Sequence, residues 1–239
     1  MTPSAGAETR DQDPAFVRRA FASIADRYVL TNHVLSLGID VLWRKRVAEL
    51  VAAESPASVL DLATGSGDLA KAVQRACGDS TRVIGADFCA PMLRHARERG
   101  VTDLVVADGM RLPFDDDSFD ALTIGYGLRN MESWSGALRE MNRVLRPGGR
   151  LVILDFSLPD FSVLRSPYRI YLHRILPTLG GWLTGNREAY AYLGESIERF
   201  PSGEKMTELI EASGFQQARS FPLWGGISSI YSAVKEEPG

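Results

Sequence analysis

Short apolar runs alternate with amphipathic stretches between residues 58 and 157 of the chain. The apolar runs have the length of buried strands, and they are SVLDLA, RVIGADF, TDLVVAD, FDALTIGYG and RLVILDFS. The stretches between them carry apolar residues at helical spacing, and they include LAKAVQRAC, APMLRHARER and SWSGALREMNRVL. Alternating strands and helices predict right-handed crossovers, so the pattern indicates a mostly parallel sheet with helices on both faces.

The pattern changes on the N-terminal side of this block. Residues 1–12 are polar, and we expect them to form a disordered tail. Asp13-Pro14 predicts the start of an amphipathic helix, because aspartate caps helices and proline suits the first helical position. A second amphipathic stretch covers residues 39–53. Together these helices predict an N-terminal cap over residues 13–54.

The alternation also stops after residue 157. Residues 158–186 are rich in aromatic and apolar groups and contain three prolines, and a predicted helix, REAYAYLGESIERF, follows. We expect residues 158–200 to form a helical lid insertion that holds the substrate. Two late strands, QQARSFPLW and ISSIYSAVK, predict a closing hairpin. The fold expected for residues 13–239 is one α/β domain, Rossmann-like and doubly wound. Its sheet is mostly parallel and seven-stranded, with an antiparallel C-terminal strand.

Composition excludes several classes of protein. The 239 residues carry a net charge of −3, which differs from the basic footprint of a nucleic-acid-binding protein. No apolar run is long enough to span a bilayer. The polar N-terminus lacks the apolar core of a signal peptide, so we expect a cytoplasmic protein. Cys77 and Cys89 lack the spacing of metal ligands, and no metal site is predicted.

The loop TGSGD lies directly between a predicted strand and a predicted helix. Gly65 and Gly67 allow a tight turn and a close approach of the backbone to a ligand. The following helix N-terminus attracts anionic groups such as a carboxylate. Asp87 closes the second strand, roughly twenty residues further on, where an acid pairs with ribose hydroxyls. The loop is shorter than the dinucleotide fingerprint, which argues against a nicotinamide dehydrogenase.

A second acid ends the third strand. The segment VADGMRLPF places Asp108 where a carboxylate can accept from an adenine amino group, and it places Met110, Leu112 and Phe114 where they can flank the base. Each feature alone has a structural alternative, such as a capped turn or a solvated acid. In combination, the order of features indicates a methyltransferase.

The chain resembles a known family at this point. VLDLATGSGD, ADF-x-x-x-ML, LPF-x-x-x-x-FD and RVLRPGGR look like the class I S-adenosylmethionine methyltransferases. FASIADRY, LSLGID-x-LWR, GYGLRN, LDFSLP, AYAYLGESIERFP and LWGGI resemble, more narrowly, the ubiquinone/menaquinone biosynthesis C-methyltransferases. These segments extend from about Phe16 to Lys235, which is nearly the whole chain.

The resemblance implies S-adenosyl-L-methionine as the cofactor. Its expected binding residues come from the glycine loop and the strand ends: Asp61, Thr64, Gly65, Ser66, Gly67, Asp87, Phe88, Met92, Asp108, Gly109, Met110 and Gly125. The chain departs from the family pattern at four positions. Val29 stands where aspartate is typical, Gly125 where serine is common, Asp155 where glutamate is usual and Tyr231 where histidine is usual.

The resemblance further implies a ring carbon of a polyprenylated quinol, demethylmenaquinol or 2-methoxy-6-polyprenyl-benzoquinol, as the acceptor. Such a carbon becomes nucleophilic when its hydroxyl is deprotonated. Arg129 is expected to stabilise the phenolate, Asn130 to hold a hydroxyl, and Asp155 to act as the base, directly or through water. Tyr28 is expected to close over the cofactor. The structural alternatives are a surface ion pair for Arg129, a turn cap for Asp155 and core packing for Tyr28.

The segment FSVLRSPYRIYLHRILPTLGGWL fits an apolar tunnel for a polyprenyl tail or, equally, an ordinary buried helical insert. Its residues Arg165, Arg169 and Arg174 are placed to face lipid headgroups, which suggests peripheral association with the inner face of the membrane. Homodimer formation is a further hypothesis. Two other functions stay open: methylation of a soluble acceptor such as an aromatic polyketide or a sterol, and a non-catalytic subunit that binds a partner.

Overall fold

The computed structural model describes residues 38–159, 162–185 and 187–237. The tail expected over residues 1–12, the first predicted helix and Tyr28 lie outside the described residues, as does most of the expected N-terminal cap. The second helix of that cap is present as α2 (Asp40–Ala52) and was predicted over residues 39–53.

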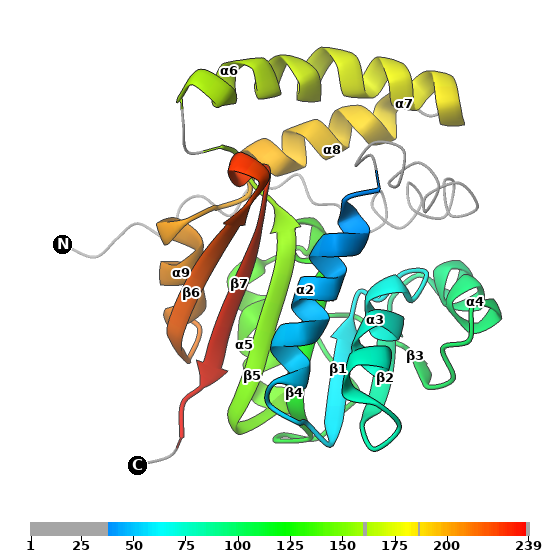
Figure 1. Ribbon diagram of the computed structural model, residues 1–239, viewed down its shortest axis with the longest axis vertical. Coiled ribbons are helices and arrows are strands. Elements are labelled where there is room, and N and C mark those ends of the chain that lie inside the picture. The colour runs from blue at the N-terminus through cyan, green and yellow to red at the C-terminus, as the bar shows by residue number, and fades with distance from the viewer. Residues whose placement is uncertain (1–37, 160–161, 186, 238–239) are drawn as a thin grey trace.

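The fold class predicted from the sequence is confirmed: seven strands form one sheet in the order β3-β2-β1-β4-β5-β7-β6 (Figure 1). Strands β1 to β5 pair in parallel, and β7 pairs antiparallel with both of its neighbours. The late hairpin places β7 between β5 and β6. The strands are β1 (Ser58–Leu62), β2 (Arg82–Asp87), β3 (Leu104–Val106), β4 (Phe119–Gly125), β5 (Leu145–Phe156), β6 (Phe215–Leu223) and β7 (Ser228–Lys235).

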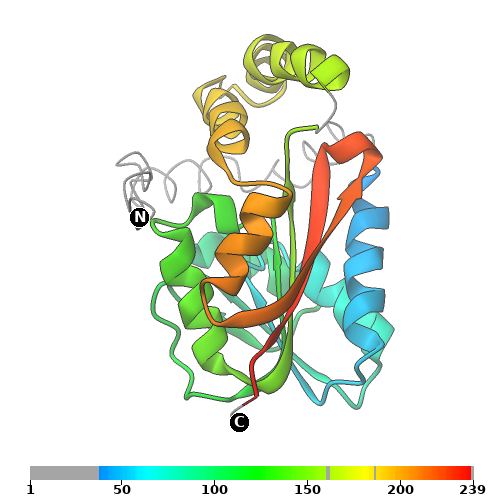
Figure 2. The ribbon, with the colours of Figure 1, turned by 90° about the vertical axis from the view of Figure 1, so that its left-hand side faces the viewer.

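Helices cover both faces of the sheet (Figure 2). On one face, α2 packs with α3 (Asp68–Cys77) and α4 (Ala90–Glu98) in a cluster that includes Val59 and Val152. On the other face, α5 (Trp134–Val144) and α9 (Glu204–Glu211) pack against Leu60 and Ile153. Successive strand residues thus point to opposite faces, and both sets are apolar, as expected for a sheet that is buried on both sides.

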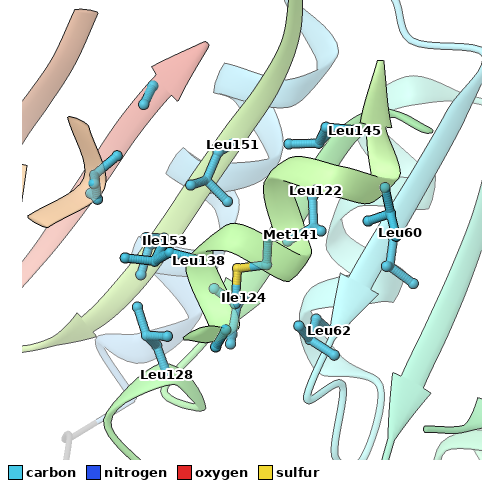
Figure 3. Packing of buried hydrophobic residues seen from close by; sticks show 14 of the residues in the cluster. Leu60, Leu62, Leu122, Ile124, Leu128, Leu138, Met141, Leu145, Leu151 and Ile153 are labelled. Carbon is cyan, nitrogen blue, oxygen red and sulfur yellow. The ribbon is translucent and has the colours of Figure 1, made fainter. Parts of the chain in front are cut away.

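The larger of the two clusters lies under α5. Leu138 and Met141 of α5 meet Leu122 and Ile124 of the central strand β4, and all four side chains are fully buried (Figure 3). This packing holds β4 and its neighbours rigidly, and it therefore fixes the loops that leave their carboxyl ends.

Proline and two glycines in the segment RPGG predict a turn before the fifth strand, but the structure differs. The segment lies inside β5, where Leu145 pairs with Phe119 and the next pair along the ladder is Ala121 with Arg150. The four residues form an irregular excursion of the strand, and Gly148 takes a φ of +75° within it. Pairing at Phe119 extends the strand back beyond the glycines, which a local turn pattern does not reveal.

The described residues between 158 and 200 form a layer of helices: α6 (Ser162–Ile170), a π-helical turn η2 (Tyr171–Ile175), α7 (Leu176–Thr184) and α8 (Arg187–Arg199). Two prolines lie within these helices. Pro167 lies inside α6 and Pro177 in the first turn of α7, just after the π turn. Figures 1 and 2 show this α6–α8 layer at the end of the molecule toward which β1, β4 and β5 point.

Candidate functional site

The glycine loop is built as the sequence predicts. It joins β1 to α3, with φ angles of +56° at Gly65 and +79° at Gly67. A Cβ atom on Gly67 would lie 2.6 Å from Cγ2 of Val101, so a side chain fits there neither in backbone angle nor in space. The amide of Gly67 donates to the carbonyl of Thr64 at 2.9 Å, which closes the turn.

Asp87 ties this loop to the end of β2. Its two carboxylate oxygens accept from the backbone amides of Gly65 and Cys89, each at 2.8 Å. Burial raises the pKa of Asp87, and the two amide bonds oppose the rise. A carboxylate can accept about four hydrogen bonds, so Asp87 keeps acceptor capacity for ligand hydroxyls beside a loop that only glycine can form.

Asp61 lies under the same loop and is fully buried. It accepts hydrogen bonds from the hydroxyls of Thr64, at 2.6 Å, and Thr123, at 2.7 Å. Burial raises its pKa to about 6, against the lowering effect of the two hydroxyls. Thr123 was not among the residues predicted from the sequence, although a threonine within the apolar run of β4 is a visible signal of a buried polar partner.

Three further predicted cofactor residues lie in the loop or beside it. The hydroxyl of Ser66 donates to Asp68 at 2.7 Å in the first turn of α3, and Asp68 also pairs with Arg99. Met92 is buried, with its Cε 3.4 Å from the position of a Cβ on Gly65. Phe88 is partly buried directly after β2. Met92 therefore supports the loop from the α4 side.

From the sequence, Asp108, Met110, Leu112 and Phe114 were predicted to surround an adenine base. In the structure, the loop after β3 places them in different surroundings. Asp108 is exposed and accepts from the amide of Met110 at 2.9 Å, so its carboxylate reaches solvent. A Cβ on Gly109 would lie 2.6 Å from Cε of Met131. Leu112 is buried in the larger core cluster, and Phe114 packs edge-on against Phe119. Core packing accounts for Leu112 and Phe114.

Met110 also packs against this core. Its Cε lies 2.6 Å from the position of a Cβ on Gly136, so the glycine makes room for the methionine. Gly125, the last residue of β4, faces Leu69 of α3: a Cβ there would lie 3.1 Å from Cδ2 of the leucine. The absence of a side chain at Gly125, one of the departures from the family pattern, is therefore matched to Leu69.

Arg129 and Asp155 form a buried ion pair beside these loops. Nη1 of Arg129 donates to Oδ1 of Asp155 at 2.7 Å and to the carbonyl of Tyr126 at 2.5 Å. The guanidinium lies over the ring of Phe156, with its carbon 5.3 Å from the centroid. Only 3% of Arg129 is exposed. The alternative considered from the sequence, a surface ion pair, is therefore wrong for Arg129. Its guanidinium is a desolvated cation that Asp155 holds in place.

Both carboxylate oxygens of Asp155 accept hydrogen bonds. Besides Arg129 Nη1, the amide of Phe156 donates to Oδ1 at 2.9 Å, and the amide of Arg129 donates to Oδ2 at 3.4 Å. Burial raises the pKa of Asp155, and the neighbouring Arg129 cation opposes the rise. The carboxylate is therefore committed to the arginine and to the backbone around it.

Asn130 lies in the same short helix, η1 (Leu128–Asn130), and connects it to the α6–α8 layer. Its Nδ2 donates to the carbonyl of Tyr126 at 3.3 Å, and its Oδ1 accepts from the hydroxyl of Tyr192 in α8 at 3.4 Å. Tyr168 of α6 stacks on Tyr171 at 6.0 Å between ring centroids. Burial raises the pKa of Tyr168 and of Tyr192, and the charge of Arg129 opposes both rises. These tyrosines were not among the residues predicted from the sequence.

The loops that follow β1 and β4 touch each other. A Cβ on Gly127 would lie 2.5 Å from the Cβ of Ala63, so only glycine permits the contact. Ala63 and Tyr126 both take positive φ angles, +52° and +60°, which are strained for residues with a side chain. The contact places the Arg129 segment directly against the glycine loop.

Tyr231, which stands where the family usually has histidine, has a structural role. Its ring is fully buried in β7, and its hydroxyl accepts from the amide of Gly203 at 3.1 Å. Gly203 precedes α9, so Tyr231 anchors the connection between α8 and α9.

Within the described residues, no helix is long and apolar enough to cross a membrane, and no group of three metal-binding side chains occurs.

Solved structures share this fold. A chain from the complex of the Haloferax volcanii Trm112 methyltransferase activator with a methyltransferase superposes with a TM-score of 0.67 at 20% identity, over 93% of this chain and 99% of that one. An S-adenosylmethionine-dependent methyltransferase from Aquifex aeolicus superposes with a TM-score of 0.53 at 17% identity, over 74% and 81%. At these identities the likeness shows the fold alone.

Similar sequences define the family. A demethylmenaquinone methyltransferase of Thermus thermophilus is 45% identical over 88% of this chain and 97% of its own length. A ubiquinone/menaquinone biosynthesis C-methyltransferase UbiE of Geobacter is 39% identical over 92% and 96%. The model of the ubiE/COQ5 methyltransferase family matches residues 7–235. The chain therefore belongs to the ubiE/COQ5 methyltransferase family.

Proposed function

We propose that this protein transfers a methyl group from S-adenosylmethionine to a ring carbon of a polyprenylated quinol. The observation that carries the proposal is the desolvated Arg129 cation, which Asp155 holds in place next to the glycine loop. Relatives with the names demethylmenaquinone methyltransferase and UbiE, both similar over nearly their whole length, support the choice of a quinol.

The residues of the loop fit the cofactor that the family implies. Gly65 and Gly67 leave backbone without side chains at the N-terminus of α3, and Asp87 and Asp108 offer carboxylate oxygens at the ends of β2 and β3. We assign Asp87 to the ribose hydroxyls and Asp108 to the adenine amino group. When bound, S-adenosylmethionine supplies an electrophilic methyl group on sulfur.

Arg129 is assigned to the phenolate of the acceptor. Loss of a hydroxyl proton to solvent would place charge on the quinol oxygen, and that charge would delocalise onto the ring carbon that accepts the methyl group. A bound S-adenosylmethionine would supply the methyl group and keep the electron pair of the methyl–sulfur bond, and the methylated ring carbon would return its proton to solvent. A preorganised cation in a site without water stabilises developing charge more strongly than solvent does.

Asp155 is assigned to the orientation of Arg129 instead of to proton removal. Its oxygens accept from the guanidinium and from two backbone amides, and its side chain is fully buried. Asn130 is assigned to a hydroxyl of the acceptor. Its link to Tyr192 lets the α6–α8 layer set the position of this amide.

Methyl transfer by the full chain tests the proposal. The chain is incubated with methyl-labelled S-adenosylmethionine and chemically reduced demethylmenaquinone or 2-methoxy-6-polyprenyl-benzoquinone with a short tail, and the products are separated chromatographically. We expect label on the ring of at least one quinol and almost none in the Arg129→Ala variant. Equal transfer to a soluble aromatic phenol would favour the soluble-acceptor function. Failure to bind S-adenosylmethionine in calorimetry would favour the non-catalytic one.

We further propose that the protein acts in the cytoplasm at the inner face of the membrane, because a polyprenyl tail holds its substrate in the lipid. Homodimer formation stays a hypothesis, and sedimentation velocity of the full chain tests it.

A further inference from the structure

The outward side of α6 and α7 exposes large apolar side chains. Val163 is 81% exposed, Ile170 56% and Trp182 84%, and Ile175 and Leu179 lie between the last two. The opposite side of the same helices packs on α8 through Leu172 and Leu176, which are buried. These helices therefore carry apolar residues on both sides, and only the inner side has a protein partner among the described residues.

The exposed residues follow helical spacing. Ile170 comes seven residues after Val163, and Trp182 comes seven residues after Ile175, so each pair lies on one side two turns apart. We call the set Val163, Ile170, Ile175, Leu179 and Trp182 the outer stripe. The helices that carry it, α6 and α7, form the outermost layer in Figure 1, at the end of the molecule that holds the candidate site.

The stripe continues onto the sheet. Trp224, in the short helix η3 (Trp224–Gly226) between β6 and β7, is 63% exposed, and Phe221 near the end of β6 is also exposed. Cδ1 of Leu164 lies 3.3 Å from the position of a Cβ on Gly225, so α6 packs directly beside this turn. Both exposed tryptophans of the described chain thus belong to one end of the molecule.

The charges along the stripe have one sign. Residues 161–187 contain Arg165, Arg169, Arg174, Arg187 and His173 but no acidic residue, in a chain of net charge −3. The neighbouring α8 contains three acids, Glu188, Glu195 and Glu198, and Glu198 pairs with Arg169 and His173 at 2.7 Å each. Nε of Arg165 donates to the carbonyl of Pro159 at 2.9 Å. Arg174 has no acidic partner among the described residues.

We propose that the outer stripe, together with Trp224, docks the protein on an anionic lipid bilayer. The apolar side chains enter the boundary between headgroups and acyl chains, and Arg174 and its neighbours meet the lipid phosphates. An isologous dimer through this face would bring the same arginines of two copies together, which charge repulsion disfavours. The location rests on the proposed function, because it places the site where a tail-bearing quinol resides.

Vesicle binding by the full chain tests the proposal. The chain is sedimented with large vesicles of phosphatidylglycerol and phosphatidylcholine, and with vesicles of phosphatidylcholine alone. We expect binding to the anionic vesicles that weakens as salt rises, since screening shortens the reach of the charges. Arg174→Glu is expected to weaken it by about fivefold or more, and Trp182→Ser to weaken it and remove most of the quenching by brominated lipids.

Arg75→Glu on α3 is the matched control. Arg75 is an exposed arginine in the last turn of its helix, far from the α6–α8 layer, so its reversal should leave binding nearly unchanged. Equal effects of Arg174→Glu and Arg75→Glu would overturn the proposal, because only overall charge would then matter. So would unchanged binding in Trp182→Ser, or a stripe-dependent dimer that does not bind vesicles.

A second readout separates this proposal from the proposed function. All three variants should methylate a short-tailed quinol in vesicle-free solution at the wild-type rate, because Arg75, Arg174 and Trp182 are exposed and none of them is assigned to the cofactor or to the quinol ring. Loss of vesicle binding with intact methylation supports the docking surface. Vesicle binding by a protein that methylates no quinol would leave the surface in place and refute the function.

Discussion

Asp61 and Asp155 are both fully buried carboxylates near the carboxyl ends of parallel strands, but their partners differ. Asp61 accepts from two hydroxyls, which carry no charge, and its pKa is raised to about 6. Asp155 faces a guanidinium at 2.7 Å. Removing the charge from Asp61 therefore relieves a desolvation cost, whereas removing it from Asp155 leaves the buried Arg129 cation without its anionic partner.

Substitutions at Asp155 distinguish a positioning residue from a base. Asp155→Asn should lower kcat by about 10²-fold or more, because Arg129 loses its charged partner, while KM for S-adenosylmethionine stays nearly constant. The acidic limb of the pH–rate profile should persist. Asp155→Glu, which restores the residue usual in the family, should recover most of the rate.

The outcome against this assignment is loss of the acidic limb in Asp155→Asn. That result would identify Asp155 as the group that removes the proton. Because a buried cation without its partner costs about 3–5 kcal/mol of stability, the assays belong at a temperature where circular dichroism shows the variant folded.

The raised pKa of Asp61 predicts a pH-dependent stability. The folded state holds the proton more tightly than the unfolded state, so the contribution of Asp61 is favourable at low pH and is lost as pH rises from about 4 to about 6. Asp61→Asn removes this loss. Relative to wild type, the variant should gain about 3 kcal/mol between pH 4 and pH 7 in urea unfolding. A constant difference over that range would show that Asp61 is not protonated when folded.

At the scale of elements, the alternating pattern located every strand of the central block, because strands that are buried on both faces are almost purely apolar. The start of β5 was misplaced, since its pairing with Phe119 depends on a neighbouring strand and not on local sequence. The helical insertion was predicted, but the bounds of its helices around Pro167 and Pro177 were not, because packing of Leu172 and Leu176 on α8 stabilises these helices despite the prolines.

For the candidate site, sequence supplied the residue types but not their partners. Strand ends located Asp87, Arg129 and Asp155 at one edge of the sheet. The tie between Asp155 and Arg129 needed the chain to fold, since the two residues lie 26 positions apart. The tyrosines of the α6–α8 layer were missed for the same reason, because an aromatic residue in an apolar segment does not show which way it points.

The glycine loop allows a matched test of fit. Gly67 and Gly185 share the same left-handed backbone, with φ of +79° and ψ near zero, but only Gly67 has a neighbour, Val101, where a Cβ would lie. Gly185→Ala should cost about 1 kcal/mol of stability, from backbone strain alone. Gly67→Ala should cost about 1–3 kcal/mol more and weaken cofactor binding in calorimetry. Equal losses in the two variants would show that the space around the loop is not limiting.

At the scale of the whole molecule, every candidate residue that the structure describes lies at or near the carboxyl edge of the parallel strands. Both core clusters lie between the sheet and its covering helices, away from that edge. The α6–α8 layer has its own smaller cluster, built on Leu172, Leu176, Tyr190 and Ile197. It meets the body through the hydrogen bond from Tyr192 to Asn130 and through apolar contacts, such as Phe156 against its cluster and Leu164 beside Gly225.

Cofactor binding should stabilise the whole domain, since a ligand that binds only the folded state adds free energy to it. At a concentration of S-adenosylmethionine 100 times its Kd, the gain is about 2.7 kcal/mol. It is measurable as a rise in Tm that increases with concentration. Asp87→Asn should shrink this rise severalfold at equal cofactor concentration. An undiminished rise would remove Asp87 from the binding residues.

The contact between Ala63 and Gly127 has a kinetic consequence. With no spare room between them, a shift of the loop that grips the methyl donor is passed at once to the backbone that carries Arg129. Donor and acceptor should then enter in a compulsory order, donor first. The measurable sign is product inhibition by S-adenosylhomocysteine that is competitive against the donor and mixed against the quinol. Gly127→Ala, which wedges the two segments apart, should uncouple the two binding events.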